Sequence, residues 1–188
     1  TTASDFDEEE IRRTISLSTS VIPVEYRETK INFLDTPGYT DFIGEVISAM
    51  RVVDSVILMV DAVNGLEVGT EIAMDYCSKF NLPRFLVINK MDRDNANFQK
   101  ALKSVEDFSD VRLIPIQLPW GEKHDFKGVI DLITMKAYKA QGKTAEEIPA
   151  EFKDAAEEAR MKLVEAAAEG DDTLLEKYLD SGSLTEEE

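Results

Sequence analysis

The sequence predicts an α/β fold in which a mostly parallel sheet carries helices on both faces, joined to a smaller α+β subdomain. Two short runs that are apolar throughout, residues 56–60 and 85–88, alternate with segments whose apolar residues recur at helical spacing. From about Val111 this alternation gives way to strand-like segments followed by helices. A parallel sheet of this kind has right-handed crossovers and binds ligands at the carboxyl ends of its strands.

The composition is that of an ordinary folded protein. The 188 residues suffice for one full domain or one domain plus part of a second, and 43% of them are hydrophobic. A net charge of −17 argues against binding DNA or RNA by bulk attraction. The longest apolar stretch, 55–62, is too short to span a bilayer. The single cysteine, Cys77, lies at an apolar helical position, which predicts a buried thiol in a reducing compartment.

The first 110 residues are predicted to form the α/β core. The expected order is a hairpin, a helix, a strand, a second helix and a strand, at residues 16–34, 42–53, 56–60, 72–80 and 85–88. The hairpin turn is placed at the polar residues 25–29, and Pro23 places the first strand at a sheet edge.

Residues 111–188 are predicted to form the α+β subdomain. Strand-like segments 111–118 and 129–139 flank a turn at 120–125, and helices follow from Pro149 to Gly170 and around 174–179. Trp120 is interpreted as a packing residue and His124 as a surface residue of the turn.

Asp35-Thr-Pro-Gly38 directly follows the second strand of the hairpin. A carboxylate at a strand end can hold Mg²⁺ through water, and a glycine lets a backbone N–H approach a terminal phosphate. Because Pro-Gly is also a common turn pair, these four residues alone do not separate a phosphate site from an ordinary turn.

Asn89-Lys-Met-Asp92 follows the apolar run 85–88. An aspartate carboxylate can accept from the two N–H donors on the Watson–Crick edge of guanine, whereas adenine presents a different pattern. The alternative is a solvated polar loop, although a chance match in a chain of this length is roughly at the per cent level. Both motifs begin where an apolar strand ends, which is where this architecture places its binding crevice.

The order of these motifs resembles the elongation factor G family of translational GTPases. The two motifs are followed by Pro115-Ile-Gln-Leu-Pro119, and residues 126–138 resemble the insert that this family carries within its GTPase domain. The similarity covers nearly the whole chain. It implies a P-loop-GTPase-like fold, with 1–110 as a partial GTPase core and 111–188 as the insert subdomain.

The resemblance implies binding of GTP or GDP together with Mg²⁺. It assigns the terminal phosphate and the guanine base to two sets of residues: Asp35, Thr36, Pro37, Gly38 and Tyr39, and Asn89, Lys90, Met91 and Asp92. Asp35 would hold the metal. Ser16 aligns with a switch-segment threonine whose hydroxyl ligates Mg²⁺ in the family, with Thr14 as a neighbouring candidate.

Tyr39 departs from the family pattern, which has a histidine at this position to orient the attacking water. Tyrosine offers one hydroxyl and an ordinary pKa of about 10, so it can hydrogen-bond a water but titrates far from neutral pH. The sequence leaves slower hydrolysis and a binding-only role open.

No Gly-x-x-x-x-Gly-Lys-Ser/Thr loop occurs in the sequence, which also lacks an initiator methionine and a secretory signal. By the resemblance, that phosphate-binding loop is expected upstream, and a segment supporting the guanine base is expected beyond Glu188. The chain is therefore interpreted as an internal piece of a longer protein, and this piece alone is expected to bind GTP poorly.

For the whole protein, the resemblance implies GTP hydrolysis during translocation on the ribosome, in the cytoplasm. Expected partners are ribosomal RNA and the stalk protein, with no membrane and no DNA. Two alternatives remain: a ribosome-binding GTP switch with little hydrolysis, and a related ribosomal protection or recycling factor that shares this domain.

Overall fold

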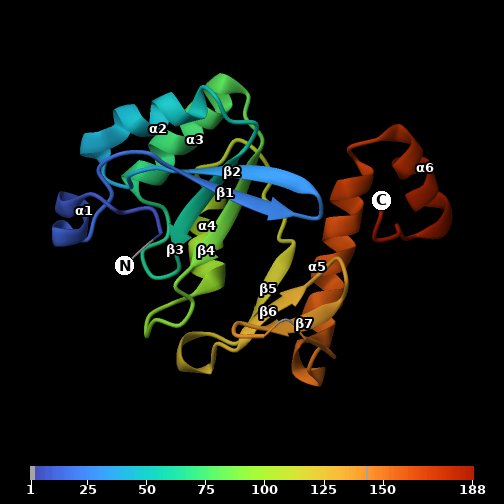
Figure 1. Cartoon of the computed structure of the whole chain (residues 1–188). Coiled ribbons are helices and arrows are strands. Elements are labelled where there is room, and N and C mark those ends of the chain that lie inside the picture. Colours follow the sequence, from blue (N-terminus) through green and yellow to red (C-terminus); the bar gives the residue numbers. More distant parts are fainter. Residues whose placement is uncertain (1–2, 143) are drawn as a thin grey trace. The chain divides into compact units, whose positions relative to one another are not determined.

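A computed structural model of the chain describes residues 3–142 and 144–188 (Figure 1). The chain divides into two compact units. The first comprises the described residues up to Val60 together with Leu66–Val87, and the second comprises Asp61–Gly65 and Ile88–Glu188. The predicted boundary between residues 110 and 111 stays a prediction. The two compact units are defined by contacts within the chain, whereas the predicted boundary marks the start of an inserted subdomain.

The first unit begins with a short helix, α1 (Glu8–Arg13), closed by a reciprocal capping box. The Asp7 side chain accepts from the Glu9 N–H at 2.8 Å, and Glu10 accepts from the Asp7 N–H at 3.2 Å. The buried Glu10 carboxylate also accepts from the N–H groups of Leu17 and Ser18, at 2.9 and 3.2 Å. These bonds lower the pKa of Glu10, with the bond from Leu17 as the largest cause. One carboxylate therefore shapes the segment that follows α1.

The predicted hairpin is confirmed, with β1 (Ser20–Tyr26) antiparallel to β2 (Thr29–Asp35). Its turn is shorter than expected, because only Arg27 and Glu28 lie outside the strands. Both have positive φ, 45° and 63°, as a two-residue hairpin turn requires. Within the described chain β1 pairs with β2 alone, so Pro23 does lie on an edge strand.

The helices and strands after the hairpin follow the predicted order. They are the 3₁₀ turn η1 (Thr40–Phe42), α2 (Ile43–Met50), β3 (Val56–Asp61), α3 (Val68–Phe80) and β4 (Arg84–Asn89). Helices α2 and α3 lie side by side (Figure 1). Cys77 of α3 is fully buried, as predicted, and burial raises its pKa.

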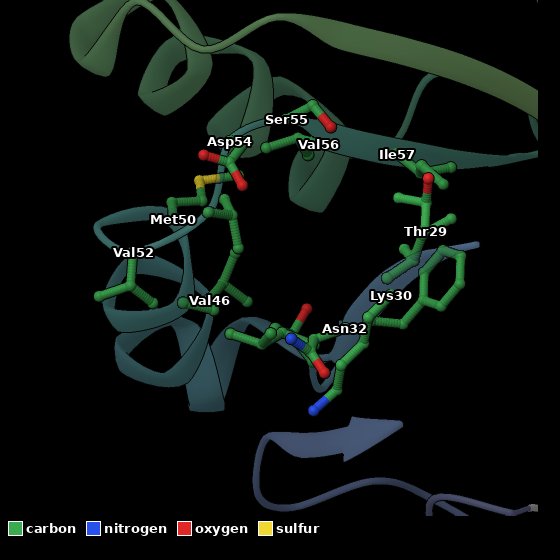
Figure 2. Close-up of a pocket in the computed structure, with 16 residues that line it drawn as sticks. Thr29, Lys30, Asn32, Val46, Met50, Val52, Asp54, Ser55, Val56 and Ile57 are labelled. Carbon is green, nitrogen blue, oxygen red and sulfur yellow. The ribbon is translucent and has the colours of Figure 1, made fainter. Parts of the chain in front are cut away.

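The strands do not form one continuous sheet, because β1–β2 and β3–β4 are separate two-stranded sheets. A groove of about 560 Å³ is lined by residues of β2, α2 and the start of β3. Figure 2 shows Asn32 of β2, Met50 of α2 and Ile57 of β3 on different sides of this groove. Alternate apolar side chains of β3 and β4 are exposed: Ile57, Met59, Phe85 and Val87.

The second unit contains α4 (Phe98–Glu106) and a four-stranded antiparallel sheet. The sheet has the order β5 (Gln117–Trp120), β6 (Gly128–Asp131), β7 (Lys136–Lys139) and β8 (Ala145–Glu146). The first predicted strand, 111–118, was wrong for 111–116, because only 117–118 lie in β5, which continues to Trp120, a residue predicted in the turn. The second predicted strand becomes the hairpin β6–β7. Between β5 and β6 lies a 3₁₀ turn, η2 (Lys123–Asp125).

Two helices complete this unit, α5 (Ala150–Ala168) and α6 (Asp172–Ser181). Pro149 is the N-cap of α5, which agrees with its predicted role. One face of α5 covers the sheet, where its Phe152, Ala156 and Leu163 pack against Ile130, Leu132 and the buried Trp120 (Figure 1). Trp120 is therefore a core residue, as predicted. Among the described residues, no helix is both long and apolar enough to cross a membrane.

Gly128 should be essential for the β6–β7 hairpin, because an added Cβ would lie 1.9 Å from the Tyr138 carbonyl oxygen. We expect Gly128→Ala to lower the free energy of unfolding by about 1–3 kcal/mol, since the strands must separate to admit it. Urea denaturation of both proteins measures the change. Gly142→Ala is the matched control, because its Cβ would meet only the Lys139 Cβ at 3.8 Å. Equal effects of the two substitutions would contradict this assignment.

Glu10→Gln should loosen the segment after α1 in a pH-dependent way. An amide offers one acceptor oxygen where the carboxylate uses two, so protection of the Leu17 and Ser18 amides should fall about fivefold at pH 7. Because the folded pKa of Glu10 is lowered, its carboxylate stabilises the segment above the ordinary glutamate pKa and ceases to do so as the pH falls through the folded value.

The measurement is amide exchange by NMR in a pH series that descends from pH 7, in which the two proteins should converge once the pH lies below the folded pKa of Glu10. Glu8→Gln, an exposed substitution in the same helical turn, is the control. A difference between wild type and Glu10→Gln that persists unchanged below that pKa would argue against the role of the carboxylate.

Candidate functional site

The predicted phosphate-side motif lies at the carboxyl end of β2, in the first unit. β2 ends at Asp35, whose side chain is exposed, and Pro37 is fully buried and anchors the turn. Gly38 has open space around it, since an added Cβ would meet nothing within 4 Å. Tyr39 is 58% exposed, and its carbonyl accepts from the Phe42 N–H at 3.0 Å at the start of the following helical turn. Gly38 and Tyr39 are thus accessible to a ligand.

The predicted switch segment leads into β1 at the same end of the hairpin as Asp35. Ser20, the first residue of β1, pairs with Asp35, and Ser16 lies four residues earlier. The Ser16 hydroxyl donates to the Asp5 carboxylate at 2.7 Å. Thr14 instead caps α1 with a left-handed backbone, and its hydroxyl donates to the Arg13 carbonyl at 2.6 Å. Of the two predicted candidates for the Mg²⁺-ligating hydroxyl, Thr14 is the C-cap residue of α1.

Glu45 of α2 holds the end of this segment. Its carboxylate accepts from the Thr19 N–H at 2.8 Å, which is the main cause of the lowered pKa of Glu45. Since α2 follows the predicted phosphate-side motif, this bond links the predicted switch segment to the helix that comes after that motif. The link lies entirely within the first unit.

The predicted base-reading motif lies at the carboxyl end of β4, in the second unit. Lys90 has a left-handed backbone, with φ 62°, and its ammonium lies 2.7 Å from the Asp61 carboxylate at the end of β3. The Ala62 N–H donates to the Asn89 carbonyl at 2.9 Å. Two adjacent strand ends are therefore fastened by one backbone bond and one ion pair.

Asp61 organises the loop after β3 as well. Its second carboxylate oxygen accepts from the Val63 N–H at 2.8 Å and from the Asn64 N–H at 3.4 Å. The Lys90 ammonium, followed by the Val63 N–H, lowers the pKa of Asp61. The carboxylate is consequently charged at neutral pH and holds Lys90 along the loop.

Around this anchor the predicted base-reading groups stay accessible. Met91 is buried with Ala62 and Ala96, whereas Asn89 and Asp92 are exposed. A hollow of about 410 Å³ is lined by Val63, Arg93, Asp94 and Asn95. An exposed carboxylate on a loop anchored through a buried neighbour is suited to accept hydrogen bonds from a planar base.

Among the described residues, no group of three or more histidine, cysteine or acidic side chains converges on a metal position. Mg²⁺ binds through few protein oxygens together with waters and phosphates, so Asp35 and Ser16 offer the right donor type. The Ser16 hydroxyl would have to turn away from Asp5 to ligate a metal. The role of each predicted site residue stays a prediction.

Sequence reasoning missed the carboxylates that support the motifs, namely Asp61 and Glu45. The signal for Asp61 was present, since an aspartate ends the apolar run 56–60 as Asn89 ends the run 85–88. For Glu45 there was none, because a half-buried glutamate within a predicted helix gives no hint of a bond 26 residues away. His124 is exposed and pairs with Asp94 at 3.0 Å, which agrees with its predicted surface position.

Comparison with known proteins identifies the family. Residues 1–180 match the family described as the elongation factor Tu GTP-binding domain. Elongation factor G of Mycoplasma pneumoniae is 38% identical over 186 residues, a match that covers 96% of this chain and 27% of that protein. A crystal structure of a protein from Thermus thermophilus superposes with a TM-score of 0.88 at 32% identity, covering 98% of this chain and 28% of the other.

The chain spans about a quarter of the length of these two relatives. The high TM-score over almost the whole chain confirms the predicted α/β fold, and the match over residues 1–180 includes both motifs. The chain therefore belongs to the family of elongation factor Tu GTP-binding domains.

Proposed function

We propose that this chain supplies the guanine-reading and γ-phosphate-sensing parts of a translational GTPase of the elongation factor G type. The observation that carries the proposal is the loop after β4, where Lys90 is fastened to Asp61 while Asp92 stays exposed. Similarity to an elongation factor G over 96% of the chain supports it.

In this proposal Asp92 accepts from the two N–H donors of guanine, and the Lys90 side chain, held by Asp61, lies along the base. A preformed loop reads a base with less ordering cost than a mobile one. Adenine lacks this donor pair, so the same carboxylate discriminates against it.

On the phosphate side, Asp35 would hold Mg²⁺ through water, with Ser16 as a further oxygen donor, and Gly38 would offer its backbone N–H to the γ-phosphate. Bound Mg²⁺ would neutralise charge on the phosphates. The open space around Gly38 supports this role, since a phosphate needs close approach to the backbone. The Tyr39 hydroxyl would orient the attacking water.

The whole protein would act on the ribosome in the cytoplasm, with translocation as its task. A phosphate-binding loop would come from a segment outside this sequence, which contains no Gly-x-x-x-x-Gly-Lys-Ser/Thr motif. The insert subdomain, residues 111–188, would meet the ribosomal stalk protein, and the whole protein would also meet ribosomal RNA.

A second candidate is a ribosome-binding GTP switch with little hydrolysis, favoured by Tyr39 at the position where the family has histidine. Tyrosine cannot act as a near-neutral base. A ribosomal protection or recycling factor is a further alternative, because such proteins would share this domain and differ elsewhere.

The longer protein should bind GDP and GTP with Mg²⁺, and Asp92→Asn should weaken that binding about 10- to 100-fold, because one charge-assisted pair of hydrogen bonds is lost. This chain alone should bind weakly, since several anchors act together on the phosphates. Isothermal titration calorimetry measures all three. Asp110→Asn, an exposed substitution in the same unit, is the control. Failure of the longer protein to bind either nucleotide would overturn the proposal and leave a scaffold role.

Ribosomes should stimulate phosphate release by the longer protein, and Tyr39→Phe should lower the stimulated rate about tenfold or more, because only the hydroxyl is lost. Single-turnover phosphate release measures the rate. Tyr26→Phe is a matched control, since Tyr26 is 60% exposed against 58% for Tyr39. Full stimulation of the wild type would exclude the low-hydrolysis switch, and its absence would favour that switch.

A further inference from the structure

Residues 121–126, in the turn between β5 and β6, contact residues 89–97, which run from the last residue of β4 to the start of α4. We name these segments the insert turn and the base loop; both belong to the second unit. The Lys123 N–H donates to the Met91 carbonyl at 2.8 Å. That carbonyl belongs to the peptide group that joins Met91 to Asp92, so the bond fixes the plane of the peptide leading into the base-reading residue.

A second contact holds the far end of the base loop. The half-buried Glu122 carboxylate accepts from the Phe98 N–H at 3.1 Å. Phe98 is the first residue of α4, which begins directly after the base loop, and the first N–H groups of a helix have no partner within it. A carboxylate is favoured there by the helix dipole as well.

Apolar packing adds a third contact. Phe126, at the end of the insert turn, packs against a cluster formed by Met91, Ala62 and Ala96. The insert turn thus meets the Met91 carbonyl through a hydrogen bond and the cluster that contains Met91 through Phe126. The remaining contact, between the exposed side chains of His124 and Asp94, contributes little in water.

The backbone of the insert turn has little freedom to deform. Gly121 has φ 83°, and a Cβ at that position would lie 2.1 Å from the Asp125 carbonyl oxygen. Lys123 also has a left-handed backbone, with φ 58°. A turn closed this tightly can act as a fixed support for the loop against which it packs.

We infer that Glu122 is a positioning residue for guanine selection, which acts by holding the base loop between the Met91 carbonyl and the start of α4. The inference rests on the proposed function of Asp92. Loss of the hydrogen bond from the Phe98 N–H should let the base loop rotate. The Asp92 carboxylate would then form poorly aligned hydrogen bonds with the two N–H donors of guanine. The insert would then contribute to nucleotide specificity without touching the nucleotide.

The test compares GDP with IDP, whose base lacks the exocyclic amino group and so makes one bond fewer to Asp92. In the longer protein, the ratio of the IDP to the GDP dissociation constant should fall about fivefold in Glu122→Ala. Glu122→Asp keeps the charge, but its side chain is one methylene too short to accept from the Phe98 N–H, so it should behave like Glu122→Ala. Glu122→Gln keeps an acceptor oxygen at the same reach, and should retain the wild-type ratio. Glu147→Ala, an exposed substitution in the same unit, is the control.

Hydrogen exchange on the same proteins provides a second readout. Amides of residues 89–97 should exchange about fivefold faster in Glu122→Ala, while amides of β6 and β7 should keep the wild-type rate. A general loss of stability would instead weaken both nucleotides equally and speed exchange throughout the second unit, and would overturn the inference.

An unchanged nucleotide ratio in Glu122→Ala would overturn it too. If the wild-type protein bound neither nucleotide, the proposed function would fail and guanine selection with it, and the exchange measurement would decide only whether Glu122 holds the base loop. Unchanged exchange in residues 89–97 would then exclude that role.

Discussion

Backbone N–H groups in irregular loops must find acceptors, and the loops around both motifs depend on carboxylates for this. Glu10 accepts from Leu17 and Ser18, Glu45 from Thr19, Asp61 from Val63 and Asn64, and Glu122 from Phe98. Each bond joins an acidic side chain to an irregular segment or to the first turn of a helix. Some of the net charge of −17 thus supports the site directly.

The two motifs differ in how firmly they are held. The base loop is fastened by Asp61 through Lys90, by the Lys123 N–H through Met91 and by Glu122 through Phe98. On the phosphate side Pro37 is buried, but Gly38 and Tyr39 are open. This contrast suits the proposed function, because a base is read by fixed geometry whereas a γ-phosphate sensor has to respond when the phosphate leaves.

The groove between β2 and β3 shows what strand patterns leave undecided. The runs 56–60 and 85–88 correctly indicated strands, but an apolar run does not show which other strand it pairs with. The result is two separate pairs of strands, with a groove of about 560 Å³ lined by β2, α2 and β3. The predicted strand 129–139 became a hairpin for a similar reason, since Asp131 accepts from the N–H groups of Ile133 and Thr134 and turns the chain.

The sequence by itself determined the order of helices and strands up to Asn89, the position of each motif at a strand end, and the burial of Cys77 and Trp120. These features depend on local periodicity and on residue type, which are visible along the chain. Tertiary structure decided which carboxylates support the motifs, because the partners of Glu45 and Glu122 lie 26 and 24 residues away in sequence. It also decided that Ser16 bonds Asp5 and that the insert turn contacts Met91, since hydrogen bonds between distant segments depend on how the chain packs and leave no periodic signal.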